Sequence, residues 1–233
     1  MRSLLRLIRT ASPQANQLTL LALALLVVKI FVLNRFAARF LGAYEAGVIV
    51  EAVLASVVAS YIFYLVVVHL REAADRAVVQ PYIAKHSARV VGDCEAQLTE
   101  IGKIANIDLS LSTVSLSDIQ VAFAKVPMAS DAPLVLAPQM RRARWIEYFE
   151  HYSRRSRGSI ARVLAQLLYL EAMHVGLLTS IDDCVHFNSV DLLRNLPLTN
   201  SSLADFAPSF FKYCEACKTL SLYLKAIADE ESP

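Results

Sequence analysis

The chain has 233 residues, a formal net charge of +2, 56% hydrophobic residues and a mean hydropathy of +0.45. This composition excludes an ordinary soluble globular protein, and the small net charge excludes a polycation that coats nucleic acid along its whole surface. The apolar excess lies in residues 18–68, whereas residues 71–233 have the mixed composition of a globular domain. The composition therefore predicts a membrane-embedded part followed by a water-facing part.

The first segment, residues 1–16, opens with the sequence MRSLLRLIRT. On a helix this sequence places three arginines on one face and aliphatic side chains on another. A short basic amphipathic helix of this kind can lie in the lipid headgroup layer. The alternative is an unstructured charged leader, because so short a helix is marginal in water.

Two apolar runs predict a transmembrane hairpin over residues 17–70. The first, at about 18–36, has 19 residues and reaches roughly 28 Å as a helix, which is close to the hydrocarbon thickness of a bilayer. The second, at about 46–68, has 23 residues and reaches roughly 34 Å, so it crosses with some tilt.

A cleavable signal peptide is the alternative for the first run, because basic residues precede it. Against this alternative, the run is long, contains Lys29 and ends in Asn34 and Arg35 rather than in a small-x-small cleavage site.

The basic residues that flank the runs predict their orientation. The segment between the runs has two, Arg35 and Arg39, whereas seven lie outside the runs. By the positive-inside rule, both termini are expected in the cytoplasm. The seven outer residues are Arg2, Arg6, Arg9, Arg71, Arg76, Lys85 and Arg89.

Each run carries a charged residue away from its ends, Lys29 in the first and Glu51 in the second. A charge within the hydrocarbon layer costs at least about 2.5 kcal/mol and is rarely left without a partner. If the chain turns near Gly42, the two residues differ in depth by roughly 6 Å, which long side chains can span. We expect an intramembrane pair, within the hairpin or between copies, and the alternative is that each side chain snorkels to the interface.

Small residues recur at helical spacing in the second run. Packing must supply the drive for helix association in lipid, and small side chains permit close approach. The sequence leaves open whether this packing face contacts the first run or another copy of the chain. Its members are Ala52, Ser56, Ala59 and Ser60.

Residues 71–233 show helical periodicity and almost no strand alternation, which predicts a cytoplasmic helical bundle and an all-α protein. Pro81 is expected to kink or restart the first helix. Ser117 followed by Gln120 resembles a capping box, and the proline-rich segment 127–138 is expected to be a linker.

The sequence contains no nucleophile elbow, Walker A loop, HExxH pair or GxGxxG turn, so neither an enzyme nor a small-molecule substrate is predicted. Cys214-x-x-Cys217 and Cys184-x-His186 supply residue types that bind zinc. Because the two cysteines of the first pair fall in a helical pattern, buried thiols are the preferred interpretation, and no metal or cofactor is expected.

A cluster of seven arginines, interleaved with aromatic residues, is the most unusual feature of this domain. Such a cluster can bind lipid headgroups or the phosphates of nucleic acid or a ribonucleoprotein, and the alternative is a solvated helix face. The seven are Arg141, Arg142, Arg144, Arg154, Arg155, Arg157 and Arg162.

The segment SYIFYLVVVHLREAADRAVVQPYIAKHSARVVGD, and more loosely ADFAPSFFKYCEACKTLSLYL, resembles a family of bacterial proteins with two transmembrane helices. Members of that type occur as membrane effectors beside retron reverse transcriptases in anti-phage defence. The resemblance implies an inner-membrane effector that disrupts membrane integrity when released or clustered. The expected partners are lipid, further copies of the chain, and a cytosolic protein or regulatory ribonucleoprotein. The alternative is a membrane-tethered scaffold or signalling subunit that recruits a cytosolic partner through its helical domain.

Overall fold

A computed structural model describes residues 12–32, 43–137, 140–194, 196 and 200–231. The expected amphipathic helix at the N-terminus and the turn near Gly42 lie outside these residues. The chain divides into two compact units, Met1–Val78 and Val79–Pro233, and the described part is mostly helical.

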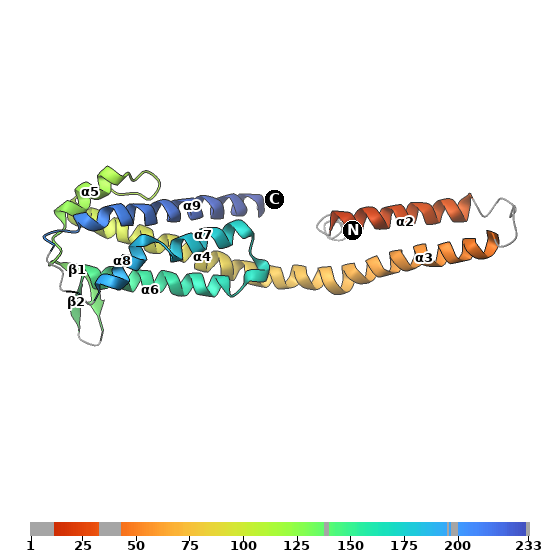
Figure 1. The fold of residues 1–233 in the computed structure, drawn as a ribbon, viewed down its shortest axis with the longest axis horizontal. Coiled ribbons are helices and arrows are strands. Elements are labelled where there is room, and N and C mark those ends of the chain that lie inside the picture. The colour runs from red at the N-terminus through yellow and green to blue at the C-terminus, as the bar shows by residue number, and fades with distance from the viewer. Residues whose placement is uncertain (1–11, 33–42, 138–139, 195, 197–199, 232–233) are drawn as a thin grey trace. The chain divides into compact units, whose positions relative to one another are not determined.

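The first unit contains helix α2 (Pro13–Phe31) and helix α3 (Ala43–Phe63), which lie side by side (Figure 1). Proline at the first position of α2 suits a helix start, because its fixed φ is already helical and its missing N–H would have no partner there. α3 continues into a π-helix, η2 (Tyr64–His69).

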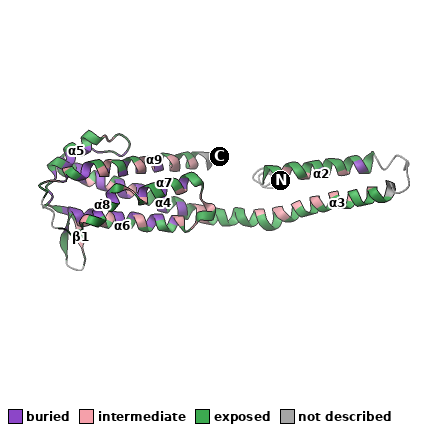
Figure 2. Ribbon diagram, viewed as in Figure 1, coloured by how far each residue is buried: buried purple, intermediate pink, exposed green. Residues whose placement is uncertain are grey.

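Most side chains of α2 and α3 are exposed, as Figure 2 shows. In α2, only Ala22 and Lys29 are buried. By length and composition, two helical stretches are able to cross a membrane, Pro13–Phe31 and Glu45–Ala105. A soluble domain rarely leaves so large an apolar surface exposed.

Helix α4 (Leu70–Ala105) follows η2 directly and continues into the second unit. Of the two outcomes expected at Pro81, a restart is absent, since α4 runs through this residue without interruption. α4 ends at Ala105 and is followed by Asn106, which has a φ of +55°. At Gly102 an added Cβ would lie 2.6 Å from the carbonyl oxygen of Ile107, so the chain reversal needs glycine there.

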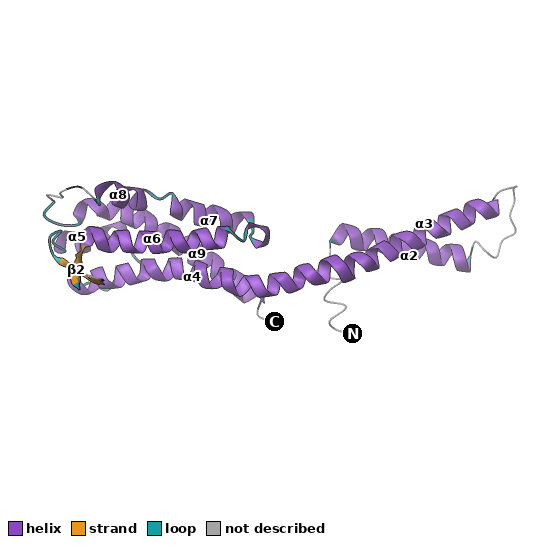
Figure 3. Ribbon diagram, turned by 90° about the horizontal axis from the view of Figure 1, so that it is seen from below, coloured by secondary structure: helices purple, strands orange, loops and turns teal. Residues whose placement is uncertain are grey.

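In the second unit, α4 packs with five shorter or similar helices around one core (Figures 1 and 3). Aromatic side chains fill the centre of this core, among them Trp145, Phe149 and Phe210. The helices are α5 (Leu116–Lys125), α6 (Trp145–Leu164), α7 (Ala172–Asp182), α8 (Val185–Leu193) and α9 (Ala207–Glu231), with 3₁₀ turns at Leu167–Tyr169 and Ala204–Phe206.

A two-stranded antiparallel hairpin replaces the expected linker at 127–138. Strand β1 (Asp131–Leu136) pairs with β2 (Arg141–Arg144), and Asp131 lies opposite Arg144. Pro133 is compatible with β1, because a two-stranded sheet consists only of edge strands. The described part of this domain is therefore helical with one small β-hairpin. Its two strands are too short for the sequence to show an alternating pattern.

The N-terminal cap of α5 also differs from the expectation. Ser115 accepts a hydrogen bond from the backbone N–H of Asp118, and the Asp118 carboxylate accepts one from the backbone N–H of Ser115. The capping box is thus Ser115 with Asp118, two residues before the expected pair, since aspartate can close the same reciprocal contact as glutamate.

His186, near the start of α8, is fully buried among aromatic rings of α6 and α9. Its ring centroid lies 5.2 Å from that of Phe149 and 5.1 Å from that of Phe210. Neither ring nitrogen has a hydrogen-bond partner among the described residues. Burial lowers the pKa of His186 to about 3.

The first prediction concerns this buried imidazole. The unfolded chain takes up a proton near pH 6.5 and the folded chain only near 3, so His186 lowers stability progressively as pH falls between these values. His186→Phe should raise stability by about 1 kcal/mol at neutral pH, because no polar group is left buried without a partner. It should raise stability by about 2 kcal/mol more at pH 5, which lies about 1.5 pH units below the ordinary histidine pKa, because phenylalanine does not titrate. Thermal unfolding followed by near-UV circular dichroism across the pH range measures both effects.

His151 is exposed, so His151→Phe is the matched control and should leave the acid dependence unchanged. Equal pH profiles for wild type and His186→Phe would contradict the prediction.

Candidate functional site

An ion pair joins the two apolar helices. Lys29, in the last turn of α2, contacts Oε2 of Glu51 in α3 through its Nζ atom. The Lys29 side chain is 11% exposed, and an added Cβ on Gly47 would lie 3.5 Å from its Cε atom. Gly47 therefore presents a flat surface on which the lysine side chain lies. The Glu51 side chain remains 42% exposed.

A second polar contact lies toward the other end of the two helices. The hydroxyl of Tyr61 donates a hydrogen bond to Oδ1 of Asn16. Lys29 follows Asn16 in α2, whereas Glu51 precedes Tyr61 in α3, so the two contacts require antiparallel helices. Polar contacts are directional, and together these two define the register of the pair in a way that apolar packing alone does not.

The packing face of α3 lies away from α2. Its four members, Ala52, Ser56, Ala59 and Ser60, are all exposed. Tyr61, which contacts Asn16 of α2, and Leu54 are partly covered. The sequence left open whether this face contacts the first run or another copy of the chain. In the described residues, the face does not pack on α2.

The π-helix η2 follows the packing face and carries an aromatic pair. The rings of Tyr64 and His69 stack with their centroids 6.2 Å apart. Short π-helical segments within longer helices occur often at functional sites. One widened turn changes the hydrophobic periodicity too little to be recognised, so the sequence did not indicate η2.

In the second unit, the seven arginines do not form one exposed patch. Arg155 contacts Oδ1 of Asp93 in α4, whose side chain is 0% exposed, and Ser156 donates to the other carboxylate oxygen at 3.1 Å. The Arg155 guanidinium also lies 5.2 Å from the ring centroid of Tyr152. Arg155 therefore joins α6 to α4.

Arg157 joins α6 to the two helices that follow it. It contacts Asp191 in α8, donates to Oδ1 of Asn188 at 3.0 Å and lies 3.5 Å from Oδ1 of Asp182 at the end of α7. Arg154 forms an exposed pair with Glu150 one turn before it. Arg155 and Arg157 thus form ion pairs within the fold, and the anion-binding patch expected of the seven arginines stays a prediction.

Arg141, Arg142 and Arg144 remain together on β2. Arg141 donates from both terminal nitrogens to Glu147 in the first turn of α6, and this contact holds the pKa of Glu147 at about 2. With Arg194, these three line a cavity of about 760 Å³. Arg162 is exposed near the opposite end of α6.

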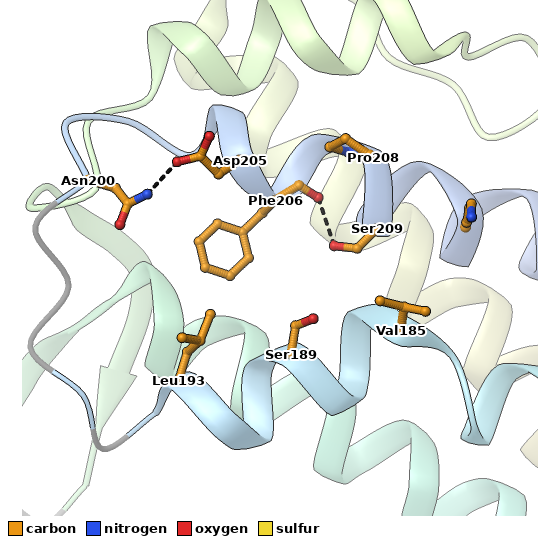
Figure 4. A pocket seen from close by; sticks show the side chains of 9 residues that line it. Val185, Ser189, Leu193, Asn200, Asp205, Phe206, Pro208 and Ser209 are labelled. Carbon is orange, nitrogen blue, oxygen red and sulfur yellow. Dashed lines mark hydrogen bonds between the residues drawn. The ribbon is translucent and has the colours of Figure 1, made fainter.

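A second cavity, of about 460 Å³, lies between α8 and the start of α9 (Figure 4). Asn200 contacts Asp205 at its rim, and the hydroxyl of Ser209 donates to the carbonyl of Phe206 at 3.0 Å. The Ser209 hydroxyl therefore bonds the backbone near the start of α9. An activated nucleophile would instead donate its hydrogen bond to a general base.

The cysteines lie mostly in the core. The Sγ atoms of Cys94 and Cys214 are 3.6 Å apart, and both residues and Cys217 are buried. Burial raises the pKa of Cys94 and of Cys184, which keeps these thiols protonated. Within the described residues, no group of three or more potential ligands is arranged to hold a metal ion.

Comparison with models of known protein families, with curated protein sequences and with solved structures found no match for this chain. The resemblance to bacterial two-helix membrane effectors therefore stays a prediction, and function is argued from the geometry.

The second prediction tests the ion pair in the apolar hairpin. Lys29→Glu and Glu51→Lys should each weaken membrane insertion, because each places like charges together. The double swap should restore at least about 0.5 kcal/mol of the summed loss, the usual lower bound for residues in contact. A translocon-based insertion assay on the full chain measures the apparent insertion free energies.

Glu45 is exposed at the start of α3 and supplies the control. Lys29→Glu combined with Glu45→Lys should give additive losses. Additive losses in the Glu51 cycle as well would indicate that the two charges act independently.

The third prediction separates two arginines of α6. Arg155→Ala leaves the Asp93 carboxylate buried without its charged partner and should lower the free energy of unfolding by about 2–3 kcal/mol, less than for a fully buried pair because Arg155 is 39% exposed. Arg162→Ala removes the same charge from an exposed site and should change it by less than about 0.5 kcal/mol. Equal losses in denaturant unfolding would show that the Asp93 contact is unimportant.

Proposed function

We propose that this chain is a bacterial inner-membrane effector that disrupts membrane integrity when several copies cluster. In this proposal α2 and α3 cross the membrane as an antiparallel hairpin with both chain termini in the cytoplasm. The observation that carries it is the division of α3 into two sides. One side is held to α2 by Glu51 and Tyr61, and the other presents the packing face, which no described part of the chain covers.

Clustering follows from the physics of helices in lipid. The packing face permits close approach of a second α3, and two helices of one copy cannot enclose an aqueous path, so several copies are needed. Glu51 retains 42% of its side-chain exposure while paired with Lys29, so its carboxylate can face a neighbouring copy or water in a cluster. Ionisable residues within membrane helices are typical of such wet paths.

The helical second unit is the proposed point of control. A partner suppresses clustering only by the difference between its affinities for the silent and the clustered states. The sequence resemblance of residues 60–93 implies the setting of anti-phage defence, and a regulatory ribonucleoprotein is the kind of partner that this setting supplies.

A scaffold or signalling subunit is the second candidate. Three apolar side chains around the turn between α6 and α7 favour it, because Leu167, Leu168 and Met173 are 59%, 91% and 60% exposed. An exposed apolar group of this kind suits a protein partner. This function requires recruitment through the second unit and no change in membrane permeability.

The fourth prediction distinguishes the two. Expression of the full chain without its partner should depolarise the inner membrane and arrest growth, as read by a potential-sensitive dye and by optical density. Ser56→Leu with Ala59→Leu should relieve both effects while the protein stays inserted, because bulky side chains block close packing without reducing hydrophobicity.

Ala46 and Ile62 are exposed on α3 about a quarter turn away from the packing face, so Ala46→Leu with Ile62→Leu is the control and should stay toxic. A normal membrane potential at high expression, both in uninfected cells and in cells challenged with phage, would leave the scaffold as the supported function.

A further inference from the structure

A basic cavity lies where the β-hairpin meets the start of α6. Four arginines line it, three from β2 and Arg194 from the end of α8, together with the carboxylates of Asp131 and Glu147. The lining thus has an excess of two positive charges. Its volume of about 760 Å³ falls within the range of small-molecule pockets, roughly 300–1,000 Å³.

The acids of this cavity do not neutralise all of its arginines. Glu147 is bound through both carboxylate oxygens by Arg141, and Arg194 shares Glu150 with Arg154. Among the described residues, neither Arg142 nor Arg144 has an ion-pair partner. Both project from one short strand, two residues apart, so they lie on the same side of β2.

The start of α6 adds to the positive potential. Ile146 and Glu147, in the first turn of this 20-residue helix, line the same cavity. The first N–H groups of a helix have no partner within it, and the helix dipole is positive at that end. The carboxylate of Glu147 accepts a hydrogen bond of 2.8 Å from the backbone N–H of Arg144. The first turn of α6 and the arginines of β2 therefore lie on the same cavity.

We propose that this cavity binds a soluble phosphorylated small molecule through the guanidinium groups of Arg142 and Arg144. Guanidinium groups bind phosphate oxygens in pairs, and a concave site concentrates their field more than a flat surface does. The apolar part of the lining is aliphatic, with Ile146 and Leu196 and no aromatic ring to stack on a base. Recognition therefore rests on the phosphate groups, and a ligand with two linked phosphates matches the two arginines.

This inference does not depend on the membrane function, because every residue of the cavity lies in the second unit. Its test uses the full chain in nanodiscs of zwitterionic lipid, titrated with inorganic pyrophosphate by isothermal calorimetry. We expect saturable binding with one pyrophosphate per chain. Arg142→Gln with Arg144→Gln should weaken binding at least about tenfold, since two charge-assisted contacts are lost.

A second double variant, which also removes two positive charges, distinguishes binding in the cavity from general attraction of pyrophosphate to a basic surface. Arg89 and Arg162 are exposed outside the cavity, so Arg89→Gln with Arg162→Gln should change the pyrophosphate affinity less than about twofold, the effect expected of distant screened charges. A loss as large as that of the cavity variant would overturn the proposal.

A measurement on the wild-type chain avoids any effect of substitution on folding. Pyrophosphate should protect Arg142 and Arg144 from modification by phenylglyoxal, as read by mass spectrometry, and should leave Arg162 unprotected. Absence of protection at Arg142 and Arg144 at saturating pyrophosphate would overturn the proposal.

Binding measured with two kinds of lipid distinguishes a soluble ligand from a lipid headgroup. Binding of pyrophosphate in zwitterionic discs supports the soluble ligand. No binding of pyrophosphate, together with a loss of phosphatidylglycerol vesicle binding in the Arg142→Gln, Arg144→Gln variant, would assign the cavity to lipid headgroups and overturn the proposal.

Discussion

A charged side chain that leaves water needs a partner, and this requirement governs both units of the chain. In the first unit, Lys29 lies over Gly47 and contacts Glu51, so a lysine that would be costly in an apolar environment becomes the contact that holds α2 to α3. In the second unit, Asp93 is buried in α4 and is paired with Arg155 from α6. In each case an ion pair contributes to the choice of which helices meet and in which register, whereas apolar burial only favours their meeting.

The same requirement explains how the arginines divide. The carboxylates at the helix ends and in the core bind those arginines that can reach them, which removes Arg155 and Arg157 from the surface available to a ligand. The arginines on β2 outnumber the acids within their reach. The unbalanced charge of Arg142 and Arg144 therefore follows from the geometry of the β-hairpin. It does not follow from the number of arginines, because four of the seven form ion pairs with carboxylates.

The two proposals place their chemistry in different units. The packing face of α3 and the exposed side of Glu51 belong to the first unit, and the basic cavity belongs to the second. Each unit can therefore be altered by substitutions that leave the other intact. The buried imidazole of His186, whose ring nitrogens have no hydrogen-bond partner among the described residues, lowers the stability of the second unit.

Composition and periodicity alone determined the two apolar helices, the helical second unit and the positions of Lys29 and Glu51 within the two apolar runs, because these depend on side-chain polarity and spacing along the chain. They also located the small-residue positions of α3. Local pattern left a restart open at Pro81, which α4 does not make, and it failed at residues 131–144, where a short hairpin leaves no periodic signal. Only the tertiary structure decided which side of α3 faces α2 and which arginines meet a carboxylate, since both depend on distances between residues far apart in sequence.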